Sequence, residues 1–173
     1  MILVTGGCGF IGSNFIINWF QRSSEDLVNI DAMTYAANKE NLKNLKNKDK
    51  YHFIEEDIVN QIAVLDILNK YKPRAIFNFA AESHVDNSIE CPDAFIKTNI
   101  NGTFNLLKST HAYWKKLSEN EKNLFRFVHI STDEVFGSLS LSEKAFTEES
   151  KYLPNSPYSA SKASSDHLVR CFH

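Results

Sequence analysis

The chain has 173 residues, 43% hydrophobic and 23% charged, which is typical of a folded globular protein and sufficient for one domain with a sizeable core. A formal net charge of −2 gives no electrostatic reason to expect a nucleic acid or an anionic membrane as a partner, and the apolar runs are too short to cross a bilayer. Three cysteines without metal-ligand spacing, and an N-terminus without a basic leader, lead us to expect a reducing, cytoplasmic setting and no metal.

Short apolar segments alternate with longer amphipathic ones, which predicts an α/β fold with a doubly wound parallel sheet covered by helices. The expected strands are residues 2–4, 27–31, 51–55, 75–79 and 124–130. The expected helices are residues 10–22, 60–71, 92–114 and 157–171, the last two opened by a proline at the first helical position. Residues 38–50, rich in Asn and Lys, are expected to be a solvated surface helix or loop rather than a binding segment.

Glycines at positions 7, 9 and 12 form a GxGxxG pattern between the first strand and the first helix, and Gly6 adds a second register. Glycine permits positive φ in a tight turn and lets a pyrophosphate approach the backbone, while the following helix directs its N–H groups at the phosphates. The strand–turn–helix context makes this otherwise weak pattern specific. We therefore predict the phosphate-binding turn of a Rossmann-type nicotinamide dinucleotide domain.

Asp31 closes the second strand about 20 residues after the turn, where the dinucleotide fingerprint places an acid for the ribose hydroxyls. A carboxylate there repels a 2′-phosphate, so NAD is favoured over NADP. The alternative is that Asp31 only caps the end of a strand. Asp57 and Ile58, just past the third strand, are similarly either an adenine contact or a surface turn.

Tyr158 and Lys162 lie four residues apart, which places a phenol and an ammonium on one face of a helix. We expect the neighbouring cation to lower the pKa of the Tyr158 phenol and prepare it as a base. Thr132, Asp133 and Glu134 come after Ser131 at the carboxyl end of the fifth strand, the edge at which open α/β sheets bind ligands. Two adjacent carboxyl groups supply separate acid and base roles if their environments separate their pKa values.

The residues after the fourth strand include two alanines, Ala80 and Ala81, that allow the chain to pass close to a cofactor. His84 follows them and is either a ligand-contacting group or an ordinary loop histidine. The remaining histidines lie on expected strands and helices and are assigned structural roles.

Together these residues resemble the extended short-chain dehydrogenase/reductase family, and within it the enzymes that dehydrate nucleotide-linked glucose. The resemblance is carried by TGGCGFIGSN, NFAAESHVDNSI, TNINGTFNLL, HISTDEVFGSL and SPYSASKASSDHLVR, which span essentially the whole chain. Asp133 is the sharpest marker, because sugar-nucleotide epimerases of the family usually have a small residue there.

The resemblance implies a redox-neutral lyase reaction on a nucleotide sugar with NAD as cofactor. Tyr158, aided by Lys162, would take the C4 hydroxyl proton; Glu134 would remove the C5 hydrogen and Asp133 would protonate the departing C6 hydroxyl. Thr132 and Ser83 would contact the sugar. The NAD contacts implied by the resemblance are Gly6, Gly9, Phe10, Ile11, Gly12, Asp31, Ala32, Met33, Thr34, Asp57, Ile58, Phe79, Ala80, Ala81, Glu82, Ser83, Thr98, Tyr158 and Lys162.

The same resemblance implies that residues 1–173 are one NAD-binding Rossmann domain, with the substrate domain of longer family members absent from this chain. It also implies a homodimer formed by the helix from Asp93 and the helix carrying Tyr158; the apolar residues of these helices alternatively face the sheet. Two other functions stay open: another NAD-dependent epimerase or dehydratase of sugar nucleotides, and a non-catalytic NAD-binding chain.

Overall fold

The computed structural model describes all 173 residues, which divide into two compact units. Unit 1 consists of Met1–Ala80 and Asn105–Ile130, and unit 2 consists of Ala81–Phe104 and Ser131–His173. No helix combines the length and the apolar character needed to span a membrane.

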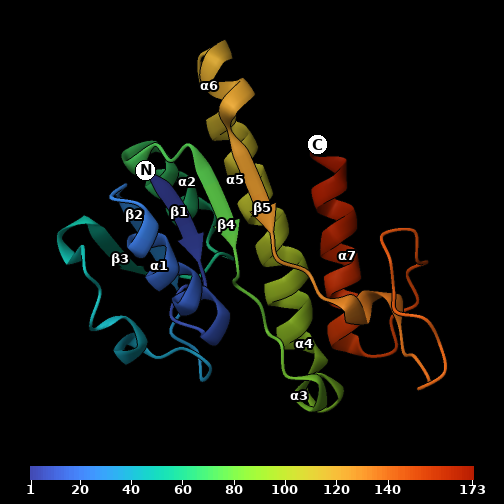
Figure 1. The fold of residues 1–173 in the computed structure, drawn as a ribbon. Coiled ribbons are helices and arrows are strands. Elements are labelled where there is room, and N and C mark those ends of the chain that lie inside the picture. Colours follow the sequence, from blue (N-terminus) through green and yellow to red (C-terminus); the bar gives the residue numbers. More distant parts are fainter. The chain divides into compact units, whose positions relative to one another are not determined.

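Unit 1 contains a parallel five-stranded sheet in the order β3-β2-β1-β4-β5 (Figure 1). The strands are β1 (Ile2–Thr5), β2 (Leu27–Asp31), β3 (Tyr51–Glu55), β4 (Ala75–Asn78) and β5 (Arg126–His129). The chain starts at the centre, moves outward to β3 and then crosses to β4, so the strand order reverses between β1 and β4. This arrangement confirms the predicted doubly wound parallel sheet. In such sheets ligands bind at the carboxyl ends of the strands where the order reverses, so we expect the site at the ends of β1 and β4.

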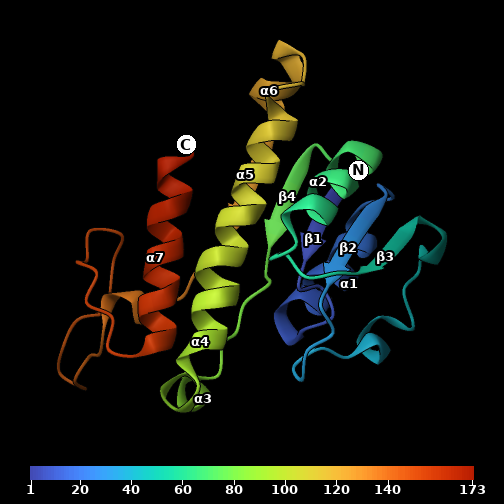
Figure 2. The same cartoon turned by 180° about the vertical axis from the view of Figure 1, so that it is seen from behind.

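Helices cover both faces of the sheet in unit 1, with α1 (Phe10–Arg22) on one face and α2 (Gln61–Tyr71) and α5 (Thr103–Trp114) on the other (Figures 1 and 2). Alternate residues of β1 face opposite sides of the sheet and pack in two different apolar cores. Ile2 packs in the cluster that contains Ile16 of α1, whereas Leu3 packs with Leu68 of α2 and Leu106 of α5. All four residues of β1 are buried, which explains the apolar run of residues 2–4 that precedes Thr5.

The Asn- and Lys-rich segment 38–50 contains two short 3₁₀ turns, η1 (Lys39–Leu42) and η2 (Lys48–Lys50). Most of its side chains are exposed, as expected, but Leu42 is buried in the core on the α1 face of the sheet. Leu45 is partly buried against the same core, so the segment is a surface connection held by two leucines.

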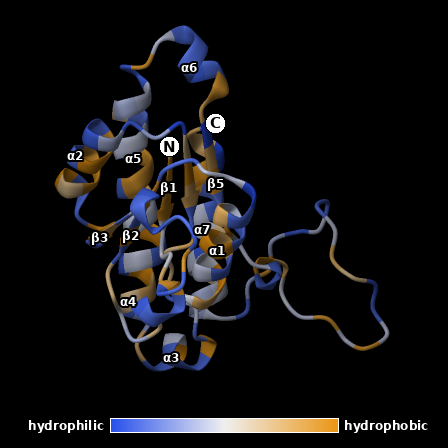
Figure 3. Ribbon diagram, turned by 60° about the vertical axis from the view of Figure 1, so that its left-hand side comes forward, coloured by the Kyte–Doolittle hydropathy of each residue, from blue (hydrophilic) through white to orange (hydrophobic).

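The prediction for the fifth strand was wrong at its start. Leu124 ends a helix, α6 (Glu119–Leu124), and the strand begins at Arg126. Ser118 and Glu121 form a capping box, in which each side chain bonds the backbone N–H of the other residue, and this motif starts the helix. The helix buries no residue and is mainly hydrophilic in Figure 3, so an apolar pattern did not reveal it.

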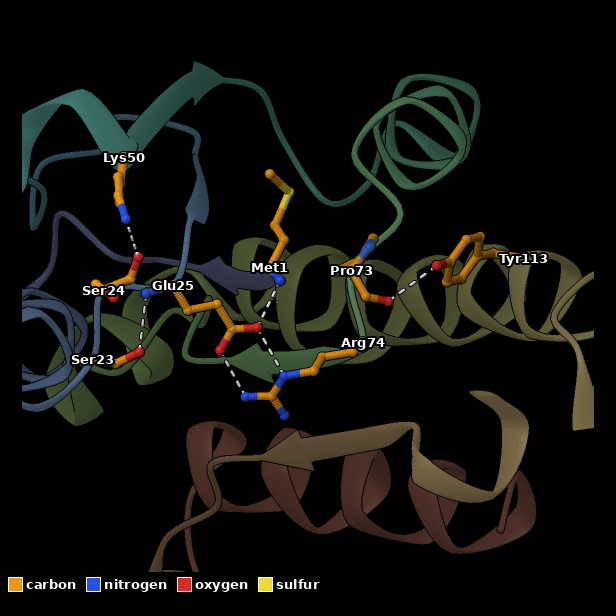
Figure 4. Close-up of polar contacts among 8 residues, drawn as sticks. All are labelled: Met1, Ser23, Ser24, Glu25, Lys50, Pro73, Arg74 and Tyr113. Atoms are coloured by element: carbon orange, nitrogen blue, oxygen red, sulfur yellow. Dashed lines mark hydrogen bonds and ion pairs between the residues drawn. The ribbon is translucent and has the colours of Figure 1, made fainter. Parts of the chain in front are cut away.

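The amino-terminal edge of the sheet is tied together by Glu25, which precedes β2 (Figure 4). Its carboxylate accepts hydrogen bonds from the Met1 ammonium at 2.6 Å and from Arg74 Nε and an Arg74 terminal nitrogen at 2.8 and 2.7 Å. Nearby, the Tyr113 hydroxyl of α5 donates to the Pro73 carbonyl at 3.1 Å. The bonds of Glu25 to Arg74 and Met1 fix the starts of β1, β2 and β4 relative to one another, and they lower the pKa of Glu25.

Unit 2 is helical. Its elements are α3 (Val85–Glu90), α4 (Pro92–Phe95), the π-helical segment η3 (Ile96–Gly102), the 3₁₀ turn η4 (Asp133–Phe136) and α7 (Pro157–Cys171). The predicted helix over 92–114 is thus divided into α4, η3 and α5. Helix α7 begins as expected, with Ser156 as a side-chain cap and Pro157 at the first position. Its small residues Ser161 and Ser165 are fully buried, so α7 packs closely against its neighbours.

Candidate active site

The glycine turn of unit 1 has the shape that its sequence predicted. Gly6 has φ +69°, and a Cβ atom there would lie 2.6 Å from the Ala80 nitrogen. A Cβ on Gly12 would lie 2.3 Å from the Gly6 carbonyl oxygen. Both positions therefore require glycine, because the backbone itself occupies the space that a side chain needs.

The N-terminus of α1 is open to an anion. Gly9 stands at its N-cap, no side chain caps the first turn, and no acidic residue lies in it. The next two side chains, Phe10 and Ile11, are exposed. An uncapped helix start beside a glycine cradle provides free N–H donors and the positive end of the helix dipole for a pyrophosphate.

A buried amide supports the turn from β2. Asn29 Oδ1 accepts a hydrogen bond from the Gly7 N–H at 3.0 Å, and its Nδ2 donates to the Tyr51 hydroxyl at 2.8 Å. The Cys8 sulfur lies 3.5 Å from the same Nδ2, and burial raises the pKa of its thiol to about 11. Asn29 was not among the residues predicted for the site, although a polar residue in the middle of an apolar strand is a signal for such a role.

Asp31 is both a structural acceptor and a candidate ribose ligand. Its Oδ2 accepts the Cys8 N–H at 2.8 Å and its Oδ1 accepts the Met33 N–H at 2.9 Å. The second of these bonds closes a turn in which Met33 has φ +53°. Because an ionised carboxylate oxygen accepts more than one hydrogen bond, this arrangement leaves acceptor capacity for ribose hydroxyls. The structural role of Asp31 is therefore observed, its ribose-binding role stays a prediction, and its neighbours Ala32 and Thr34 are exposed.

The other predicted cofactor residues of unit 1 lie at the ends of β3 and β4. Asp57 Oδ1 accepts the Val59 N–H at 3.0 Å, which forms the surface turn considered as its alternative role. Ile58 is buried, so its side chain belongs to the core. The N–H of Ala80 donates to the Thr5 hydroxyl at 3.3 Å, which brings the chain leaving β4 against the glycine turn.

In unit 2, the predicted cofactor segment Ala81–Ser83 is held by an asparagine that sequence analysis missed. Asn99 Oδ1 accepts the Glu82 N–H, and Asn99 Nδ2 donates to the Glu82 carbonyl, both at 2.9 Å. The same Nδ2 donates to Ser161 Oγ of α7 at 2.8 Å. Asn99 and the predicted cofactor contact Thr98 both lie in η3, and π-helical turns are often found at functional sites.

His84 has a structural position. It is the N-cap of α3, and its Nδ1 accepts the Asn87 N–H at 3.4 Å. This contact favours the loop role over the ligand role for this histidine.

The predicted catalytic residues of unit 2 lie together. Thr132 hydrogen-bonds the Tyr158 phenol with its side chain, and its Oγ1 also accepts the Glu134 N–H at 3.3 Å. Tyr158 and Lys162 are 8% and 3% exposed, one turn apart on the buried face of α7. The charges of Asp133 and Glu134 raise the pKa of the Tyr158 phenol, which shows that both carboxylates lie near it. The structure thus brings all five predicted catalytic residues into one cluster.

The pKa prediction for Tyr158 was wrong in its direction. Burial raises the pKa of the phenol, and the charges of Glu134, Asp133 and Asp166 raise it further against the opposing hydrogen bond from Thr132. Burial also lowers the pKa of Lys162 to about 8, opposed by Asp166. The spacing of Tyr158 and Lys162 indicated the cation, but it indicated neither the burial of the phenol nor the charge of Asp166. Burial and the three carboxylates together outweigh the effects that lower the pKa.

The sheet and glycine turn of unit 1 are those of a dinucleotide-binding domain, and comparison with known proteins defines the family. The family model for GDP-mannose 4,6 dehydratase matches residues 3–173, and the chain belongs to this family. A dTDP-glucose 4,6-dehydratase of Xanthomonas campestris pv. campestris (strain B100) is 52% identical over 171 residues, which cover 99% of this chain and 48% of that protein. The corresponding protein of Haemophilus influenzae is 52% identical over 172 residues, covering 99% and 51%. The recognition of a nucleotide-sugar dehydratase from the motifs is confirmed.

Solved structures agree with this assignment. The dTDP-glucose 4,6-dehydratase of Streptomyces venezuelae, solved with NAD bound, superimposes with a TM-score of 0.86 at 38% identity, covering 99% of this chain and 51% of that chain. A UDP-glucose 4-epimerase of Thermus thermophilus in complex with NAD gives 0.84 at 27% identity, covering 99% and 50%. The chain therefore spans about half the length of the relatives that it matches.

Proposed function

We propose that this chain carries the NAD-binding turn and the proton-transfer residues of a dTDP-glucose 4,6-dehydratase. The reaction converts dTDP-glucose into its 4-keto-6-deoxy derivative and releases water. The observation that carries the proposal is the cluster of Thr132, Asp133 and Glu134 around the Tyr158 phenol. Relatives of that name that are 52% identical to the chain support the choice of substrate.

The residues of unit 1 fit NAD. Gly6 and Gly12 leave the backbone bare where a pyrophosphate approaches, and the uncapped start of α1 supplies N–H donors. Asp31 would bind the ribose hydroxyls and would repel the extra phosphate of NADP. When bound, NAD supplies the acceptor and later the donor of a hydride.

Tyr158 would take the proton of the C4 hydroxyl as that carbon is oxidised. Its raised pKa keeps the phenol protonated at rest, so the neighbouring Lys162 ammonium has to stabilise the phenolate. With a pKa of about 8, Lys162 retains most of its charge at neutral pH. The Thr132 hydroxyl, hydrogen-bonded to the phenol, would position the C4 oxygen, and Ser83 would contact the sugar.

The acidic pair would carry out the elimination. A ketone at C4 acidifies the C5 hydrogen, which Glu134 would remove as a proton, while Asp133 would donate a proton to the departing C6 hydroxyl. The carbon–oxygen bond at C6 breaks and water leaves. Return of the hydride to C6 and of the proton held by Glu134 to C5 would then give the 4-keto-6-deoxy sugar. Asp133 is exposed, whereas Glu134 is partly buried and bonded through its N–H to Thr132. Different environments allow one carboxyl group to act as an acid and the other as a base.

The experiment is an assay of the protein expressed from its complete reading frame with dTDP-glucose, following the alkali-labile absorbance of the 4-keto product. We expect product from the parent protein and none from Tyr158→Phe, with NAD binding unchanged in that variant. A parent protein that retains NAD and forms no product would refute the proposal. We expect residues 1–173 by themselves to bind NAD with little turnover, because the relatives extend well beyond them and positioning of the sugar dominates the rate.

A second candidate function is that of an NAD-dependent dehydratase or epimerase that acts on another sugar nucleotide. It is supported by the family model, described for GDP-mannose, and by the UDP-glucose 4-epimerase neighbour. Parallel assays with dTDP-glucose, UDP-glucose and GDP-mannose decide between these substrates by their kcat/KM values. A non-catalytic NAD-binding role is the outcome if all three substrates fail.

We further propose that residues 1–173 form a single NAD-binding domain of a cytoplasmic homodimer. The ring centroids of Phe104 and Phe172 lie 6.2 Å apart, and both side chains are more than a third exposed, which provides an apolar contact on unit 2. Leu107, by contrast, is buried in the core. Three free cysteines support a reducing compartment. Sedimentation tests this interface. We expect the parent to be a dimer and the Phe104→Ser, Phe172→Ser double variant to be a monomer.

A further inference from the structure

The carboxylate of Asp166 in α7 binds two hydroxyl groups with one oxygen. Asp166 Oδ2 accepts hydrogen bonds from Ser131 Oγ at 2.6 Å and from the Tyr152 hydroxyl at 3.2 Å. Ser131 ends the link from β5, and Tyr152 belongs to the long connection that leads into α7. One side chain thus joins three segments of unit 2.

Both partners of Asp166 are connected to the predicted catalytic residues, Ser131 through the chain and Tyr152 through a ring contact with η4. Ser131 is the residue before Thr132, so its anchor fixes the start of the Thr132–Glu134 segment. The Tyr152 ring lies 4.9 Å from His167 and 5.4 Å from Phe136, the last residue of η4, as measured between ring centroids. The acidic turn is therefore held to α7 at its beginning by Ser131 and at its end through Tyr152.

Asp166 also stands one helical turn after Lys162, on the same side of α7. Its charge opposes the effect of burial on Lys162, and it is the carboxylate that acts on that ammonium. Asp133 and Glu134, on η4, raise the pKa of Tyr158, and Asp166 itself adds to this effect. At Tyr152, Asp166 raises the pKa of the phenol and Arg170, further along α7, lowers it. Asp166 thus supplies both the charge that favours the protonated form of Lys162 and the oxygen that accepts the hydrogen bonds of Ser131 and Tyr152.

We propose that Asp166 is a positioning residue, which fixes the Thr132–Glu134 segment to α7 through Ser131 and Tyr152 and keeps Lys162 protonated beside Tyr158. The proposal rests on the proposed function for the roles of those groups. Asp166 has no direct part in the proton transfers. It sets the relative positions of the acidic turn and the phenol and the charge state of the lysine.

Two variants separate the two effects. Asp166→Asn removes the charge but keeps a side-chain oxygen that accepts from the hydroxyls. The double variant Ser131→Ala, Tyr152→Phe removes both donors and keeps the charge. The titration of Lys162 is followed by NMR of ¹³C-labelled lysine, with its signal assigned by its loss in Lys162→Arg. Hydrogen exchange of residues 131–136 reports on the acidic turn.

We expect Asp166→Asn to lower the midpoint of the Lys162 titration by about one pH unit. The double variant should leave that midpoint nearly unchanged and accelerate exchange of residues 131–136 by about fivefold, as the loss of hydrogen bonds worth about 1 kcal/mol predicts. Asp166→Glu, which keeps the charge on a longer side chain, should retain the parent midpoint even if it perturbs packing.

An unchanged midpoint in Asp166→Asn, or unchanged exchange in the double variant, would overturn the proposal. Neither measurement requires a sugar nucleotide. A protein that lacks dehydratase activity but shows both effects would therefore refute the proposed function and leave the role of Asp166 intact.

Discussion

Asn29 and Gly7 are joined by a hydrogen bond of 3.0 Å, in which the backbone N–H of the glycine turn donates to the side chain of a central strand. Asn29 is fully buried, and its other polar atom donates to Tyr51. An amide buried in an apolar strand is costly unless its atoms are bonded. Here that requirement is met by bonding the turn, so β2 determines the position of the turn backbone.

Replacing Asn29 by Leu should therefore destabilise unit 1 and weaken NAD binding. The Gly7 N–H loses its acceptor in a buried site, which costs about 1–3 kcal/mol in the free energy of unfolding. Urea unfolding and NAD titration measure the two effects. Tyr51→Phe is the matched control, because it removes a donor–acceptor contact of Asn29 but leaves the bond to Gly7, and it should cost about 1 kcal/mol or less. Equal stability of Asn29→Leu and the parent would contradict this role.

Gly9 and Gly12 offer a second matched pair. The Cβ of Gly12→Ala would lie 2.3 Å from the Gly6 carbonyl oxygen, so the turn has to move, and we expect loss of NAD binding with a destabilisation of about 1–3 kcal/mol. The Cβ of Gly9→Ala would meet that oxygen at 3.4 Å, an ordinary contact, so this variant should lose only the small preference for glycine at the N-cap and be destabilised less than Gly12→Ala. If Gly12→Ala binds NAD as the parent does, the turn is not a rigid phosphate-binding cradle.

The parts of the site that could be predicted from sequence depend on local geometry. The glycine turn, α1 and the start of α7 follow from residues that are neighbours in the chain, such as Gly12 in the turn and Ser156 with Pro157 at a helix start. The parallel sheet follows from the alternation of apolar and amphipathic segments. For the turn and the two helices, the pattern and the physical cause lie within about a dozen residues of one another.

The parts that could not be predicted depend on distant contacts. The raised pKa of Tyr158 comes from burial and from carboxylates that only the fold brings near it. The π-helical turn at Asn99 accompanies bonds to Glu82 and Ser161, which are remote in sequence. The error at Leu124 was different, since the capping box of Ser118 and Glu121 was present in the sequence and indicated a helix.

Glu25 should make stability depend on acid pH. Its pKa is lowered below 4.5, chiefly by hydrogen bonds from Arg74, so its folded carboxylate holds fewer protons than the unfolded one. The stability it contributes is fully present above pH 4.5 and is lost as the pH falls through the folded pKa. Glu25→Gln should therefore be less stable than the parent at pH 7, and the difference should shrink in acid. Thermal unfolding from about pH 7 to about pH 3 measures it.

The matched control for Glu25 is Glu55→Gln. Glu55 pairs with Lys39 at 2.8 Å, but both side chains are more than half exposed, so this ion pair should contribute little. Its loss should leave the melting temperature nearly unchanged at pH 7. A Glu25→Gln variant that behaves like Glu55→Gln throughout this range would show that the cluster at the start of the sheet does not stabilise the fold.

Lys162→Met should stabilise unit 2 at neutral pH while removing the proposed activity. Burial lowers the pKa of Lys162 from 10.5 to about 8, so the folded protein holds the buried ammonium at a cost that is fully present below pH 8. That cost disappears as the pH rises from about 8 to 10.5, where the unfolded chain binds more protons than the folded one. A methionine of similar length avoids the cost at every pH.

The melting temperature of the Lys162→Met variant should thus exceed that of the parent at pH 7 and approach it at pH 10. The control Lys151→Met, on an exposed loop, should show no such convergence. A variant less stable than the parent at pH 7 would mean that the hydrogen bonds of the lysine outweigh its desolvation.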